Sequence, residues 1–175
     1  MKKIFFAALA MCFICASCDN NGNADKGNGM KEKNIASSDA ITKAFETGDV
    51  SKIDSVVAPD FLDHTDQGDK KGPDSLKSAV AMMRNMFKDM KAEKVKELAD
   101  DEYVFTWMHY SGTSEGAMGM HKGPFSMNAV EVAKFKGGKA IEHWGFANAQ
   151  DMMKLMGEHE NMGNDMSKPD SAKTK

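Results

Sequence analysis

The sequence predicts an α+β domain shaped as a cone, with about three N-terminal helices packed on a curved antiparallel sheet and a short helix at its C-terminal end. Two observations predict this class. Apolar side chains recur at helical spacing up to about residue 90, and from residue 103 they alternate with the period of two that strands show. Helices followed by a run of strands are typical of α+β rather than α/β architecture. A length of 175 residues favours one domain.

Three helices are expected first, at residues 37–47, 50–57 and 72–90. Ser37 or Ser38 can cap the first, and Gly48 ends it. Pro73 begins the third, because proline suits the first helical position.

Strands are expected at residues 103–110, 125–135 and 139–147, with a further one near 94–99 and a closing helix at 150–156. Gly137-Gly138 makes the hairpin turn before the last strand.

The first eighteen residues have the features of an export signal. Lys2 and Lys3 precede an apolar run, 4–14, that is too short to span a bilayer, and small residues follow it. The stretch ending at Cys18 resembles a bacterial lipobox, which implies a lipid on that cysteine. Because Cys15 stands where leucine is usual, cleavage without lipidation is the alternative.

These features divide the chain into a signal peptide (1–17), the lipidated Cys18 with a flexible tether (18–36), the folded domain (37–157) and a polar, disordered tail (158–175). The protein is therefore expected in the cell envelope, anchored to a membrane on its periplasmic or surface side. Removing residues 1–17 deletes two lysines and no acids, which moves the formal net charge from -3 to -5. Such a charge argues against a nucleic-acid partner.

An ordered series of short motifs covers nearly all of the domain. The series is Phe45-x-x-Gly48-Asp49, Val57-Ala58-Pro59-Asp60-Phe61-x-Asp63-His64, Gly72-Pro73-x-Ser75-Leu76-Lys77, Gly138-Lys139-x-Ile141-Glu142-His143-Trp144-Gly145 and Leu155-Met156-Gly157. It resembles SnoaL-like proteins, relatives of polyketide and ester cyclases in the nuclear-transport-factor-2-like superfamily. The resemblance implies a curved sheet around a pocket, a homodimer packed through the sheets, and ring closure by an intramolecular aldol step without metal or cofactor.

One position departs from the cyclase pattern. The family's catalytic Asp falls four residues after the tryptophan of the last strand, where this chain has Asn148. An amide cannot take up the proton, which argues against an unmodified cyclase mechanism. Asn148 could instead bind a ligand carbonyl.

Five side chains are expected to form the ligand pocket: Trp107, Met127, Trp144, Phe146 and Asn148. Strand alternation puts Trp144, Phe146 and Asn148 on one face, which the resemblance places inside the cone. For Phe146, plain core packing is preferred. His143 alternates to the opposite face and is expected on the outer sheet surface.

Three residues are candidate acids or bases. Glu131 lies mid-strand on the apolar face of Met127, where desolvation would raise the pKa of a carboxyl group. His109 shares a strand face with aromatic residues, and His64 lies in a loop that the resemblance places near the pocket mouth. For each, a purely structural role is the alternative, including a strand register shifted by one for Glu131.

The methionines allow a further interpretation. Eight of them lie between residues 82 and 127, and flexible thioethers suit permissive apolar pockets. Met118-x-Met120-His121, and the tail residues Met156, His159, Met162 and Met166, also offer soft ligands that suit Cu(I).

Three hypotheses follow, in this order. The first is a module that binds a small, largely apolar, carbonyl-containing molecule without cofactor. The second is a cofactor-independent cyclase, isomerase or hydrolase. The third and weakest is a Cu(I)-binding envelope protein.

Overall fold

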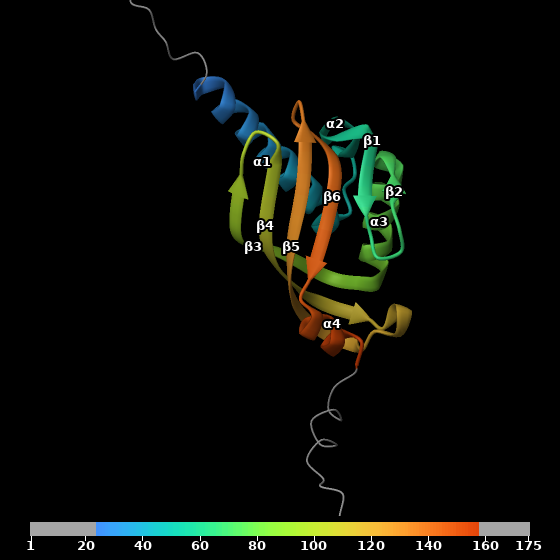
Figure 1. Ribbon diagram of the computed structural model, residues 1–175. Coiled ribbons are helices and arrows are strands. Elements are labelled where there is room, and N and C mark those ends of the chain that lie inside the picture. The colour runs from blue at the N-terminus through green and yellow to red at the C-terminus, as the bar shows by residue number, and fades with distance from the viewer. Residues whose placement is uncertain (1–23, 158–175) are drawn as a thin grey trace, which may run out of the picture.

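The computed structural model describes residues 24–157, and it has the α+β class that the sequence predicts (Figure 1). Four helices and six strands follow in the order α1 (Ala24–Thr47), α2 (Ile53–Val56), β1 (Val57–His64), β2 (Lys70–Lys71), α3 (Gly72–Met86), β3 (Phe87–Ala99), β4 (Tyr103–Glu115), β5 (Lys122–Lys136), β6 (Lys139–Ala147) and α4 (Ala149–Leu155), with a short 3-10 turn at Ala117–Gly119 between β4 and β5.

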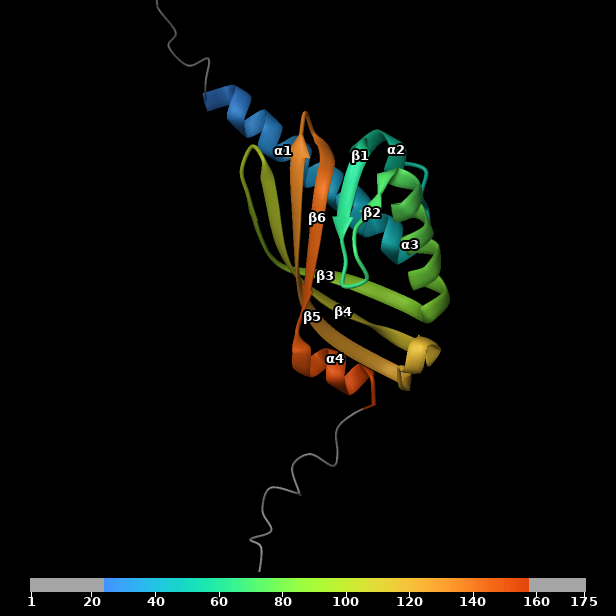
Figure 2. The ribbon, with the colours of Figure 1, turned by 45° about the vertical axis from the view of Figure 1, so that its right-hand side comes forward.

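The strands form one curved sheet in the order β2-β1-β6-β5-β4-β3. Figure 2 shows α1 and α3 on its concave side, with β3 and β4 bending beneath them. The expectation of a wholly antiparallel sheet is wrong, because β1 pairs with β6 in parallel. Strand β1 contains Pro59, which cannot donate a backbone hydrogen bond. The pairing with β6 accommodates this proline, because its register shifts between Val57 and Leu62.

Helix α1 begins 13 residues before the start expected from Ser37. The segment assigned to a flexible tether is thus helical from Ala24, and tertiary contacts explain the difference. The side chain of Asn34 is fully buried, and its Nδ2 donates to the carbonyl of Asp101 at 3.0 Å. The hydroxyl of Ser37 donates to the carbonyl of Gly138 at 2.7 Å. These bonds fix α1 to the turns at one end of the sheet.

Strands β3 and β4 are longer than expected. Helix α3 ends at Met86, four residues early, and β3 begins immediately with Phe87. The segment 111–123, which lies between the expected strands 103–110 and 125–135, mostly continues β4 and begins β5. Gly112 on β4 permits the pairing of β4 with β3, because a Cβ atom at this position would lie 2.8 Å from the carbonyl oxygen of Lys88 on β3.

The two faces of the sheet differ in their surroundings. On β4, Val104, Thr106 and Met108 point toward the helices and are buried, and the main core lies between these strands and α1, α2 and α3. The alternate residues point outward. Within the described residues, none of the helices is both long and apolar enough to cross a bilayer.

Candidate functional site

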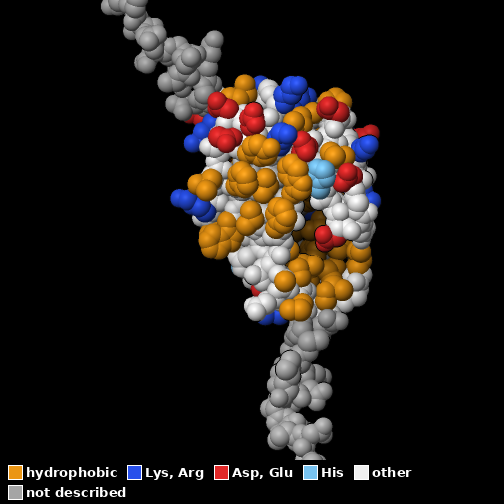
Figure 3. Space-filling view, in the orientation of Figure 1, with side chains coloured by type: hydrophobic (Ala, Val, Ile, Leu, Met, Phe, Trp, Pro, Cys, Tyr) orange, Lys and Arg blue, Asp and Glu red, His pale blue; other side chains and the backbone are white. Residues whose placement is uncertain are grey.

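A cavity of about 310 Å³ lies between the concave face of the sheet and helices α1 and α3. Its walls are largely apolar, and four methionines contribute to them: Met82, Met83, Met90 and Met127. Figure 3 shows a hollow beside the sheet with mainly hydrophobic side chains on its visible walls. Unbranched thioethers adapt to differently shaped ligands, so such a wall suits a small apolar molecule.

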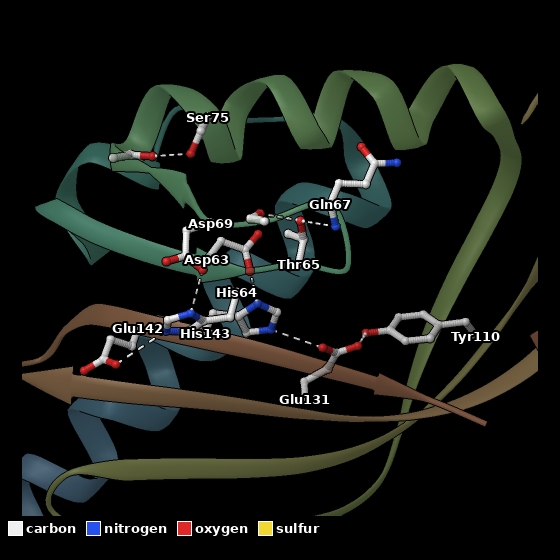
Figure 4. A network of polar contacts seen from close by, with 12 residues as sticks. Asp63, His64, Thr65, Gln67, Asp69, Ser75, Tyr110, Glu131, Glu142 and His143 are labelled. Carbon is white, nitrogen blue, oxygen red and sulfur yellow. Dashed lines mark hydrogen bonds and ion pairs between the residues drawn. The ribbon is translucent and has the colours of Figure 1, made fainter. Parts of the chain in front are cut away.

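Four polar side chains line this cavity as one hydrogen-bonded chain (Figure 4). The Nδ1 atom of His143 lies 2.8 Å from Oδ1 of Asp63, and its Nε2 atom lies 3.1 Å from Oε2 of Glu131. The hydroxyl of Tyr110 donates to Oε1 of Glu131 at 3.0 Å. The order is therefore Asp63–His143–Glu131–Tyr110.

Each member of this chain comes from a different strand, and strand pairing explains why they meet. Asp63 on β1 is the register partner of His143 on β6. Glu131 on β5 faces Gly145 on β6, where a Cβ atom would lie 3.0 Å from the Glu131 carboxylate. Glycine at this position therefore leaves room for the carboxylate to reach the His143 ring.

His143 carries the positive charge of the chain. Burial by itself would lower the pKa of the imidazole, but the hydrogen bonds and charges of Asp63 and Glu131 outweigh it and raise this pKa to about 9. The side chain keeps 30% of its surface exposed, and it lines the cavity. Around neutral pH the ring is an imidazolium that donates from both nitrogens.

Tyr110 stays protonated next to this charge. Burial raises the pKa of its phenol, and the charge of Glu131 together with their hydrogen bond raises it further. The site therefore offers a carboxylate that can accept a proton, beside a neutral phenol that can donate a hydrogen bond.

The structure places two of the predicted site residues in the cavity wall, Glu131 and Met127. Alternation along β5 was the correct guide, because Met127 and Glu131 share the inward face. Whether Glu131 is catalytic stays a prediction.

The expected pocket positions of Trp107, Trp144 and Phe146 are wrong. All three point away from the cavity, and the side chains of Trp107 and Phe146 are 49% and 59% exposed. The aromatic face of the strands, which the sequence analysis places inside the cone, is the convex face. The same error misplaced His143, which was expected outside and lies inside.

The other three candidates also lie elsewhere. Asn148 is an exposed N-cap of α4, where its side chain accepts a hydrogen bond from the amide of Asp151. The ring of His109 lies on the outer face, 3.4 Å from Oδ1 of Asn128. The ring of His64 stacks on Trp144 and bonds to Asp69, and it does not line the cavity.

Sequence reasoning missed Asp63, Tyr110 and His143 as site residues. A usable signal existed, since a carboxylate predicted on an apolar strand face needs a buried partner. The inward positions of the neighbouring strands hold the partners His143 and Tyr110.

The structure also bears on the copper interpretation. Met120 is buried in a core cluster with Phe87 and Leu155, so its thioether faces away from solvent, whereas Met118 and His121 are exposed. Four of the residues named above lie outside the described residues: Met162, Met166, His159 and the lipidation candidate Cys18. Among residues 24–157, no three or more His, Cys, Asp and Glu side chains cluster so as to hold a metal ion.

Comparison with protein families gives one match, to the SnoaL-like polyketide cyclase family over residues 37–155. The chain belongs to this family. A comparison with functionally curated proteins finds no match.

Solved structures share the fold. A candidate polyketide cyclase from Bacillus cereus ATCC 10987 has 21% identity and a TM-score of 0.61, over 71% of this chain and 80% of that one. A candidate SnoaL-like polyketide cyclase from Jannaschia sp. CCS1 has 14% identity and a TM-score of 0.65, over 74% and 95%. A nuclear transport factor 2-like protein from Anabaena variabilis ATCC 29413 has 12% identity and a TM-score of 0.58, over 67% and 88%.

Proposed function

We propose that the cavity binds a small, largely apolar, carbonyl-containing molecule and that Glu131 removes a proton from the carbon next to its carbonyl group. The observation that carries this proposal is the chain Asp63–His143–Glu131–Tyr110 on the wall of an apolar cavity. Desolvated charges are costly to maintain, and they concentrate where chemistry needs them. Membership of a cyclase family agrees with this type of reaction.

The geometry suggests how the proton moves. Both Glu131 oxygens already accept one hydrogen bond, and each keeps a second lone pair for a ligand. When the carboxylate takes the proton, the ligand becomes an enolate and its charge collects on oxygen. The hydroxyl of Tyr110 can then donate to that oxygen, and the imidazolium of His143 offsets its charge.

Ring closure or isomerisation would complete the reaction without a cofactor. The enolate carbon attacks a second carbonyl of the same molecule, a carbon–carbon bond forms, and Glu131 returns its proton to the new alkoxide. In an isomerisation the proton returns to a different carbon. In this scheme Glu131 supplies from β5 the base that Asn148 cannot supply.

Proton exchange tests this proposal without knowledge of the natural substrate. We would incubate the purified protein with 4-phenyl-2-butanone in D₂O and follow deuterium incorporation beside the carbonyl by NMR. We expect protein-dependent exchange that Glu131→Gln abolishes, while Glu142→Gln, a control on the outer side of β6, retains it. Equal exchange by Glu131→Gln and the original protein would refute the assignment of Glu131.

The second candidate function is binding without turnover. It is favoured by the fact that both Glu131 oxygens are already hydrogen-bonded, which would let the polar chain serve as a fixed recognition element. A tightly retained organic molecule, identified by native mass spectrometry and released unchanged, would support this function over catalysis.

We further propose that the domain is exported and held at a membrane by a lipid on Cys18. The support is the basic start, the short apolar run and the lipobox-like stretch. Labelling cells with a palmitate analogue should mark the protein, and Cys18→Ser should abolish the label. An unlabelled protein that still fractionates outside the cytoplasm would indicate cleavage without lipidation.

We also propose a homodimer formed through the outer sheet face. Apolar side chains are exposed there on adjacent strands, among them Phe105, Trp107, Val130 and Phe146. Figure 3 shows hydrophobic side chains gathered over β4, β5 and β6. Contiguous exposed apolar patches are rare on monomers and mark contact surfaces.

A further inference from the structure

The charges on the cavity wall are unbalanced. Among the described residues that line it, Asp63 and Glu131 are acidic, His143 is the one basic residue, and lysine and arginine are absent. Arg84, the single arginine of the sequence, donates instead to the carbonyl of Glu46. The hydroxyls of Ser38 and Thr42 add polarity without charge.

The net charge of the acidic and basic groups follows from their hydrogen bonds. The two ring nitrogens of His143 each face a carboxylate oxygen, at 2.8 Å and 3.1 Å, so each contact requires one proton. Two protons shared among two carboxylates and one imidazole leave one net negative charge. This count is the same whether a proton lies on the ring or on a carboxyl oxygen.

Before any proton transfer, the positive charge of His143 is already paired with two carboxylates of the protein. Both of its N–H groups point at carboxylates of the protein, and the phenol of Tyr110 is directed at Glu131. A ligand carboxylate entering the cavity would therefore lose its hydration and meet a net negative wall without gaining an ion pair.

We propose that the cavity selects against anions and accepts uncharged carbonyl compounds: ketones, aldehydes, esters or lactones rather than free carboxylic acids. This inference rests on the proposed function only in that a ligand occupies the cavity.

Two related dyes provide the probes. N-phenyl-1-naphthylamine is uncharged, and 8-anilino-1-naphthalenesulfonate adds one negative charge to nearly the same skeleton. Fluorescence titration of the purified protein gives a dissociation constant for each, and the ratio between the two is the measured quantity. We expect the neutral dye to bind at least about tenfold more tightly, in line with repulsion between like charges at a low effective dielectric constant.

Charge variants separate this repulsion from the greater apolarity of the neutral dye. The titrations are run at pH 6, below the ordinary histidine pKa of 6.5, so that the His143 ring keeps its proton in the variants. Asp63→Asn and Glu131→Gln then each remove one negative charge, so each should shift the ratio toward the anionic dye by about tenfold. Asp60→Asn, an exposed position on the same strand, is the matched control and should leave the ratio unchanged. Retained binding of the neutral dye shows that a variant is folded.

The outcomes separate the two proposals. A neutral dye that binds, together with a ratio that moves in both charge variants but not in Asp60→Asn, supports the inference. Equal binding of both dyes, with a ratio unmoved by either charge variant, overturns charge selection and leaves the proposed function standing. Failure of both dyes to bind the original protein overturns both, because the cavity would then not admit an apolar ligand.

Discussion

The Nε2 atom of His143 lies 3.1 Å from Oε2 of Glu131, and the two residues belong to neighbouring strands joined by a tight Gly137-Gly138 turn. This contact joins the only described basic side chain of the cavity wall to its candidate base. It therefore links the stability of the fold to the protonation of the site.

The first prediction concerns stability and pH. The folded pKa of His143 is raised to about 9, above its ordinary value of 6.5. Its stabilising effect should therefore be complete below pH 6.5 and disappear as pH rises through 9. Urea unfolding at pH 6, 7.5 and 9.5 should show the free energy of unfolding falling over this range. His109→Gln should retain the slope, and a slope that also survives in His143→Gln would contradict the prediction.

The second prediction concerns the charge partner of His143. Asp63→Asn removes one of the two carboxylates that raise the pKa of the ring, so this pKa should fall below 9. NMR titration of the histidine Cε1–H signals measures it directly. Asp60→Asn should leave the His143 signal unchanged. A pKa still near 9 in Asp63→Asn would mean that Glu131 alone holds the charge.

The third prediction concerns Tyr110. Tyr110→Phe removes the hydroxyl that bonds Glu131 and, in the proposed reaction, the enolate oxygen. Exchange of 4-phenyl-2-butanone protons should fall roughly 100-fold, as when one oxyanion donor is lost. Binding of the neutral dye should persist. Tyr103→Phe, at the other tyrosine of the chain, should exchange normally, and a fully active Tyr110→Phe would exclude the hydroxyl from the reaction.

The sequence predicted the fold class because periodicity and turn residues are local signals. Gly137-Gly138 and the alternation of residues 139–147 identified β6, and Pro73 identified the start of α3. Strand β1 was missed, because its pairing with β6 connects residues far apart in the chain and Pro59 is typical of a break. The helical segment 24–36 was missed because its stabilising bonds, such as that of Asn34, are tertiary.

The site was predicted only in part, for a different reason. Alternation shows which residues share a strand face but not which face of a curved sheet is concave. Glu131 was placed correctly because its own neighbours are apolar. Trp107 and Trp144 were placed wrongly, because large aromatic side chains suggest a core and here lie on the outer face.

The fourth prediction concerns that outer face. Trp107→Lys places a charge among the exposed apolar side chains of the outer sheet face, so it should convert the proposed dimer to a monomer. Sedimentation velocity measures the change, and dye binding in the cavity should be unaffected. Met153→Lys, at an exposed apolar position on α4, should leave the oligomeric state unchanged. A protein that is monomeric before any substitution would contradict the dimer.

The fifth prediction concerns the early part of α1. Asn34→Ala removes a buried donor to the carbonyls of Asp100 and Asp101, and the free energy of unfolding should fall by about 1–3 kcal/mol. Asn85→Ala, at an exposed position of α3, is the control and should have little effect. Equal unfolding free energies for the two variants would show that the helix before Ser37 is not fixed by Asn34.

The parallel pairing of β1 with β6 has a consequence for the order of folding. Asp63 and His143 are separated by 80 positions in the chain, so their contact closes a long loop whose entropy must be overcome first. The hairpin of β5 and β6 can form locally and bring Glu131 to His143 much earlier. We therefore expect the imidazole to acquire its two carboxylates in sequence, and the cavity to reach its final charge only when β1 has docked on β6.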